Sequence, residues 1–126
     1  MCGIFGVINK QGNGNFKEAL NLMNHRGPDY TGIYEDENVF LGHNRLSIID
    51  LDNRSNQPFI KDEWAIIFNG EIYNYIELIK EHRLNVSTSS DTEVLLEMYK
   101  KMGKSCLEYL NGMFAFCIYN KQTKDY

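Results

Sequence analysis

The chain has 126 residues, of which 43% are hydrophobic and 13% aromatic, so it can bury a core as one domain and is not a disordered chain. Its net charge of −4 comes without a basic cluster, which argues against nucleic acid or an anionic membrane as a partner. The three cysteines, Cys2, Cys106 and Cys117, lack CxxC spacing, and no secretory signal or long apolar span is apparent. We therefore expect a reduced, cytoplasmic protein in which Cys106 and Cys117 are core residues.

The first predicted element is a buried strand directly after Cys2. Residues 3–8 are apolar, β-branched or aromatic with two interleaved glycines, as in a strand that another backbone approaches closely. If Met1 is removed, Cys2 carries both a thiol, with a pKa of about 8.5, and an α-amine, with a pKa of about 7.7–8.0. Nucleophile and base would then share one residue, although an ordinary thiol is the alternative.

A helix is predicted next, because apolar residues recur at helical spacing from Phe16 to Met23. It should end before residues 24–29, where Gly27-Pro28 prevents continuation. From the residues alone, His25 and Arg26 are the solvated end of this helix.

Two strands are predicted at residues 31–34 and 39–46, joined by an acidic turn. In the second strand, His43 and Arg45 continue an apolar face. They are either a rim of exposed charge or a guanidinium that points into a pocket.

Residues 64–68 predict a strand that is apolar on both faces, which indicates a layered sandwich. From the residues alone, the Asn69-Gly70 dipeptide that follows predicts a turn.

Two amphipathic helices should follow, one over residues 73–82 and a second that starts after Ser90. Ser90 and Glu93 have the spacing of a capping box, and Asp91 is a favourable charge at a helix N-terminus. Gly103 should end the second helix. A short helix at 105–110, a strand at 113–119 and a polar turn complete the chain.

Five blocks of this sequence resemble, in order, the class II glutamine amidotransferases. The closest likeness is to the glutaminase domain of a glutamine-hydrolysing asparagine synthetase. The resemblance implies an α+β fold of the N-terminal-nucleophile hydrolase type, an αββα sandwich of two antiparallel sheets between helix layers. The blocks are Cys2 with its strand, His25 to Asp29, Gly42 to Leu51, Phe68 to Tyr75 and Ser90 to Glu97.

The resemblance implies that Cys2 attacks the side-chain amide of glutamine, while the Asn69 side chain and the Gly70 N–H hold the oxyanion. Arg45 would pair with the substrate α-carboxylate, and Glu71 and Asp91 would receive its α-ammonium. Further implied site residues are Ile48 and Ile49, with backbone contacts to substrate, and His25 and Arg26, in a loop beside the nucleophile.

No metal or cofactor is expected for glutamine hydrolysis. ATP, magnesium and aspartate would be used by a C-terminal synthetase domain that receives the ammonia and is absent from this chain, so residues 1–126 look like a truncated glutaminase domain. A homodimer is one assembly that the resemblance allows. Two alternatives remain: a non-catalytic fragment of the same fold, and an amidotransferase with another ammonia acceptor.

Overall fold

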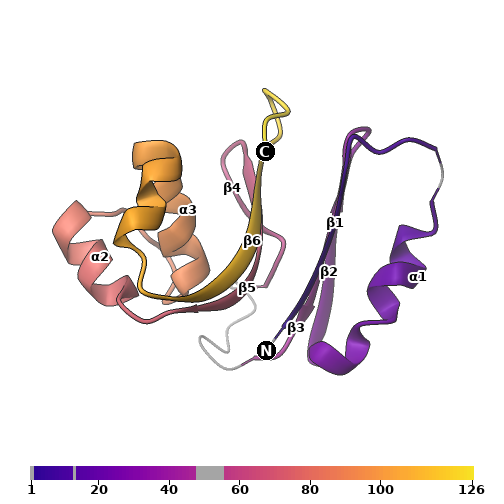
Figure 1. The fold of residues 1–126 in the computed structure, drawn as a ribbon, viewed down its shortest axis with the longest axis horizontal. Helices are drawn as coiled ribbons and strands as arrows, with labels where there is room; N and C mark the ends of the chain where they lie inside the picture. The colour runs from indigo at the N-terminus through magenta and orange to yellow at the C-terminus, as the bar shows by residue number, and fades with distance from the viewer. Residues whose placement is uncertain (1, 13, 48–55) are drawn as a thin grey trace.

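The fold is a sandwich of two antiparallel sheets between helices, as expected (Figure 1). The computed structural model describes residues 2–12, 14–47 and 56–126. The first sheet has the strand order β1-β3-β2, and the second has the order β4-β5-β6. The strands are β1 (Gly3–Ile8), β2 (Tyr30–Glu35), β3 (Val39–Arg45), β4 (Phe59–Lys61), β5 (Trp64–Ile72) and β6 (Gly112–Asn120).

Helices cover the outer face of each sheet (Figure 1). Helix α1 (Phe16–Asn21) and the 3-10 helix η1 (Asn24–Arg26) cover the first sheet, whereas α2 (Tyr75–His82), α3 (Asp91–Met102) and the 3-10 helix η3 (Gly103–Tyr109) lie beside the second. The expected helices are therefore present. In the described part of the chain, no helix has the length and apolar character needed to cross a membrane.

Strand β5 is longer than predicted and passes through Asn69-Gly70, so the prediction of a turn there is wrong. Its pairing with β6 continues to the partners Ile72 and Gly112. A Cβ atom on Gly70 would lie 2.2 Å from the Met113 carbonyl oxygen. Glycine thus serves here for close approach of two strands rather than for a turn. The short strand β4 was not predicted at all.

The start of α3 is only partly as predicted. The Ser90 hydroxyl accepts a hydrogen bond from the Thr92 N–H at 3.2 Å, so Ser90 is the N-cap. Glu93, however, does not complete a capping box. Its side chain is fully buried and instead accepts hydrogen bonds from the backbone N–H groups of Ser87 and Thr88 at 2.9 and 2.7 Å. It also pairs with Lys61 at 2.8 Å, because a buried carboxylate needs several donors and a cation.

Side chains of β5 point alternately into two hydrophobic cores, one on each face of the second sheet. Ile66 and Phe68 pack with α2 and α3, whereas Ala65 and Ile67 pack between the sheets against Val39 of β3. His43 and Arg45 share the face of Val39 and are 0% and 5% exposed. The expectation of a rim of exposed charge is therefore wrong, because the second sheet covers this face.

His43 makes stability depend on pH. Burial lowers its pKa from 6.5 to about 4, and the nearby Arg45 charge acts in the same direction while the Phe68 backbone opposes it. Between pH 6.5 and about 4, His43 is therefore protonated in the unfolded chain but neutral in the folded chain. We expect this residue to remove about 3 kcal/mol of unfolding free energy as the pH falls from 6.5 towards 4.

Denaturant unfolding across this pH range measures the effect. His43→Phe should flatten the dependence relative to the wild-type chain, because it removes the titrating group and keeps a flat ring. An equally steep dependence in the variant would show that other groups cause it.

Candidate active site

Cys2 lies directly before β1, and its thiol contacts the residue that follows β3. The Leu46 N–H donates to Cys2 Sγ at 3.3 Å, and Sγ lies 3.6 Å from the Leu46 carbonyl oxygen. The side chain is half-buried. Contacts with the backbone of Leu46 thus fix the position of the sulfur. Met1 lies outside the described residues, and its removal stays a prediction.

The loop after α1 packs against Cys2. Arg26 donates from Nε and Nη2 to the Cys2 carbonyl oxygen, both at 3.3 Å. His25 is exposed, and its Nδ1 lies 3.2 Å from the Leu22 carbonyl oxygen. A Cβ atom on Gly27 would lie 2.2 Å from the Asn44 carbonyl oxygen, so this loop can approach β3 only with glycine at that position.

Asp29 ties the end of the same loop to the end of β3. Its N–H donates to the Arg45 carbonyl oxygen at 3.0 Å, and its Oδ2 accepts from the Ser47 N–H at 2.7 Å. The loop and the chain on either side of Arg45 therefore form one hydrogen-bonded unit beside Cys2.

Cys2 shares a cavity with three other predicted site residues. The cavity has a volume of about 370 Å³ and brings the nucleophile candidate together with Asn69 of the second sheet and with the loop after α1. Its lining residues are Cys2, Gly3, Ile4, Met23, His25, Arg26 and Asn69.

Among the described residues, β5 has no strand partner on one side at Asn69 and Gly70. Strand β4 pairs with β5 only as far as Ile66. Beyond it, the Phe68 N–H donates to the Gln57 side chain at 2.6 Å and the Ile72 N–H to Asp91 at 3.0 Å. Alternate N–H groups of a strand point the same way, so the Gly70 N–H points to this edge too.

The Asn69 side chain enters the layer between the sheets, since it alternates with Phe68 and follows Ile67 by two residues. Its Oδ1 is buried and has no hydrogen-bond partner among the described residues. The carboxamide is therefore not fixed by a bond to its oxygen. Its orientation can be set by a ligand.

Arg45 is a buried cation at the end of β3. Its Nη1 donates to the Asn56 Oδ1 atom, and its side chain is 5% exposed. The predicted contacts of Ile48 and Ile49 lie outside the described residues.

Asp91 and Glu71 are the two acidic residues predicted for the site, and neither lines the cavity of Cys2. Asp91 is 5% exposed, and burial raises its pKa, while hydrogen bonds from the Ile72 and Thr92 N–H groups oppose the shift. The neighbouring Glu71 charge raises this pKa further, so the two carboxyl groups are close enough to repel. Glu71 itself is exposed. Two such carboxyl groups provide a place for a cation.

Sequence reasoning missed Asn56 and Gln57 as parts of the site. Asn56 holds Arg45, and Gln57 holds the edge of β5. The dipeptide lies between predicted elements and belongs to no periodic pattern. A buried glutamine in a loop, 7% exposed here, gives no signal before the fold is known.

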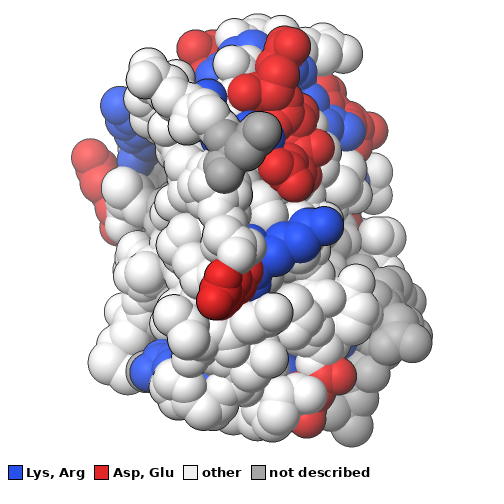
Figure 2. Space-filling model, turned by 90° about the vertical axis from the view of Figure 1, so that its right-hand side faces the viewer, with Lys and Arg blue, Asp and Glu red and all other residues white. Residues whose placement is uncertain are grey.

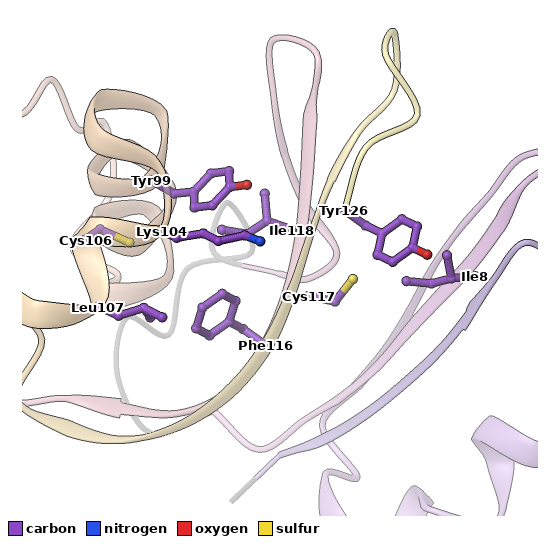
Figure 3. Close-up of a pocket in the computed structure, with 9 residues that line it drawn as sticks. All are labelled: Ile8, Tyr99, Lys104, Cys106, Leu107, Phe116, Cys117, Ile118 and Tyr126. Carbon is purple, nitrogen blue, oxygen red and sulfur yellow. The ribbon is translucent and has the colours of Figure 1, made fainter.

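A second cavity, of about 450 Å³, lies along β6 and contains none of the predicted site residues (Figure 3). Cys106 and Cys117 line it together with apolar side chains. Cys106 is fully buried, whereas Cys117 is half-buried and packs against the core between the sheets. Burial raises the pKa of both thiols, which makes them poor nucleophiles.

One face of the molecule carries charged side chains of both signs (Figure 2). On the face shown in Figure 2, lysine and arginine side chains are dispersed among uncharged and acidic ones and form no continuous basic surface. Within residues 2–12, 14–47 and 56–126, no three His, Cys, Asp or Glu side chains are grouped so that they could hold a metal ion.

Comparison with known proteins gives a family for this arrangement. The model of the glutamine amidotransferase domain family matches residues 1–126. The chain is 46% identical to asparagine synthetase [glutamine-hydrolyzing] 1 of Bacillus subtilis, and the match covers 96% of the chain and 21% of that protein. It is 40% identical to asparagine synthetase B [glutamine-hydrolyzing] of Escherichia coli, over 100% of the chain and 24% of that protein.

The chain thus spans about a quarter or less of the length of these two relatives. The family match covers every residue of it, and the sandwich of two antiparallel sheets agrees with the fold expected for that family. The chain belongs to the glutamine amidotransferase domain family.

Proposed function

We propose that this domain hydrolyses glutamine to glutamate and ammonia, with Cys2 as the nucleophile. The observation that carries the proposal is the shared cavity of Cys2 and Asn69, in which a nucleophile and a candidate oxyanion donor come from different sheets. The names of the relatives, which describe glutamine-hydrolysing enzymes, support the same reaction.

The reaction begins with attack of Cys2 Sγ on the side-chain carbonyl carbon of glutamine. A carbon–sulfur bond forms, the carbonyl oxygen gains the negative charge, and the thiol proton passes to the α-amine of Cys2 once Met1 has been removed. The Leu46 N–H, 3.3 Å from Sγ, holds the sulfur in position. The Asn69 side chain and the Gly70 N–H stabilise the oxyanion.

Collapse of this intermediate breaks the carbon–nitrogen bond. The protonated amine gives its proton to the departing nitrogen, which leaves as ammonia, and a γ-glutamyl thioester remains on Cys2. Water then attacks the thioester carbon, and glutamate leaves as the free thiol re-forms. Each step uses only the chain's own groups, glutamine and water.

Recognition of a free amino acid requires a cation and an anion at fixed positions. Arg45 serves the α-carboxylate, because its planar guanidinium can donate two parallel hydrogen bonds. Asp91 and Glu71 serve the α-ammonium. Burial is the main cause of the raised pKa of Asp91, and the Glu71 charge adds to it, so a bound cation would offset the repulsion between the two carboxyl groups.

In the intact protein, the ammonia would pass to a synthetase domain that uses ATP and magnesium to convert aspartate to asparagine. The names of the relatives favour this acceptor over another one. The alternative of a non-catalytic fragment has no specific observation in its favour, because Cys2 and Asn69 are present and line one cavity.

The role of Cys2 is tested by replacing it. Cys2→Ala should abolish release of glutamate from glutamine, because no other group near the cavity can form the thioester. Cys117→Ala should retain the activity, since that thiol lines the other cavity. Glutamate release is measured with purified protein, and activity that survives in Cys2→Ala would exclude the proposed mechanism.

Binding and catalysis should separate in kinetics. Arg45→Lys and Asp91→Asn should raise KM, and removing one partner of a desolvated charge pair costs on the order of 2–5 kcal/mol. Asn69→Ala should instead lower kcat, because its donor acts when the oxyanion forms, at a cost of roughly 2.7–4 kcal/mol.

Steady-state glutaminase kinetics on the three variants give both constants. If Asp91→Asn leaves KM unchanged, Asp91 serves only to accept hydrogen bonds from the start of α3 and from the Ile72 N–H of β5. Glu71 alone then binds the ammonium.

A further inference from the structure

Two adjacent residues, Asn56 and Gln57, contact two different parts of the candidate site. Asn56 accepts a hydrogen bond from the guanidinium of Arg45 through Oδ1. Gln57 accepts one from the Phe68 N–H through Oε1, at 2.6 Å. A segment of two residues therefore touches both the cation at the end of β3 and the unpaired edge of β5.

Gln57 is itself held from three sides. Its Nε2 donates to the Thr92 hydroxyl at 3.2 Å, so the amide cannot turn without losing that bond. Its backbone carbonyl packs on β2, where a Cβ atom added to Gly32 would lie 1.9 Å from the oxygen. The side chain is 7% exposed. Gln57 thus joins the first sheet, the edge of β5 and the start of α3.

The bond to Phe68 bears on Gly70 because both N–H groups point to the same edge of β5. Phe68 is fixed by Gln57 and Ile72 by Asp91, at 2.6 and 3.0 Å, and Gly70 lies between them. Fixing a strand on both sides of one residue fixes the direction of that residue's N–H. An oxyanion donor must be held in place before charge develops, or reorganisation reduces its effect.

We propose that Asn56 and Gln57 are two positioning residues of the glutamine site with separate roles. Asn56 orients the Arg45 guanidinium for the substrate α-carboxylate, and Gln57 orients the Gly70 N–H for the oxyanion. This assignment rests on the proposed glutaminase function and adds to it. Neither residue needs to touch the substrate.

The two roles predict opposite kinetic effects from neighbouring positions. The carboxylate is bound equally in the ground state and the transition state, so loss of the Asn56 contact should raise KM and leave kcat near the wild-type value. The oxyanion exists only during the reaction, so loss of the Gln57 contact should lower kcat and leave KM near the wild-type value. A purely structural role of the dipeptide would move both constants together in either variant.

The test uses four variants of the intact protein in glutaminase assays. Asn56→Ala removes the acceptor for Arg45 and should raise KM about tenfold, whereas Asn56→Asp keeps an acceptor oxygen and should restore KM to near wild type. Gln57→Met keeps the length but removes both hydrogen bonds, and it should lower kcat about tenfold. Thr92→Val removes only the bond to Nε2 and should lower kcat less.

Amide hydrogen exchange supplies a readout that does not depend on activity. The Phe68 amide should exchange faster in Gln57→Met than in the wild-type protein, and at an unchanged rate in Asn56→Ala. The two variants differ by one position in the chain, so each is the matched control of the other.

Parallel changes of kcat and KM in both variants, or protection of the Phe68 amide that survives Gln57→Met, would overturn the positioning roles while leaving the proposed function intact. A wild-type protein that releases no glutamate would instead overturn the proposed function together with this assignment. A KM effect confined to the Asn56 variant and a kcat effect confined to the Gln57 variant would support the two positioning roles.

Discussion

The unpaired edge of β5 is the constraint on which the candidate site depends. Among the described residues, this strand has a strand partner on one side only beyond Ile66, yet Ile67, Phe68 and Ile72 are buried. Buried backbone N–H groups must be bonded, and here side chains take the place of a strand. Gln57 and Asp91 satisfy the N–H groups of Phe68 and Ile72. Gly70 lies between them, and its N–H is the backbone donor of the proposed oxyanion site.

The same edge explains why charges can be buried here. Arg45 and Asp91 are each 5% exposed, and a buried charge without a partner is costly. Arg45 is bonded to Asn56, and Asp91 receives hydrogen bonds from backbone N–H groups. In the proposed function, the α-carboxylate of glutamine would add an anion beside Arg45, and its α-ammonium would add a cation beside Asp91.

Much of the fold could be predicted because its elements have strong local signals. Ser90 is the N-cap of α3, as the sequence indicated, since the next helical N–H needs an acceptor wherever the helix lies. Glu93 did not follow its local motif, because the lysine of β4 and the loop before α3 reach its buried carboxylate. The local rule failed where contacts distant in sequence compete.

The site was less predictable for the same reason. Asn69-Gly70 has the local pattern of a turn, but pairing with β6 keeps it extended. The place of Arg45 inside the sandwich depends on the second sheet, which forms from residues after it. Asn56 and Gln57 carry no pattern of their own, since their partners lie on β3, β5 and α3. Such roles become visible only when the elements are assembled.

Covalent labelling with a glutamine-like electrophile, followed by peptide mapping, tests most directly whether Cys2 is the nucleophile of a glutamine site. We predict a single label on Cys2 that excess glutamine prevents, and none on Cys106 or Cys117, whose thiols have raised pKa values. A label on either of those two cysteines in place of Cys2, or a label on Cys2 that glutamine does not prevent, would contradict it.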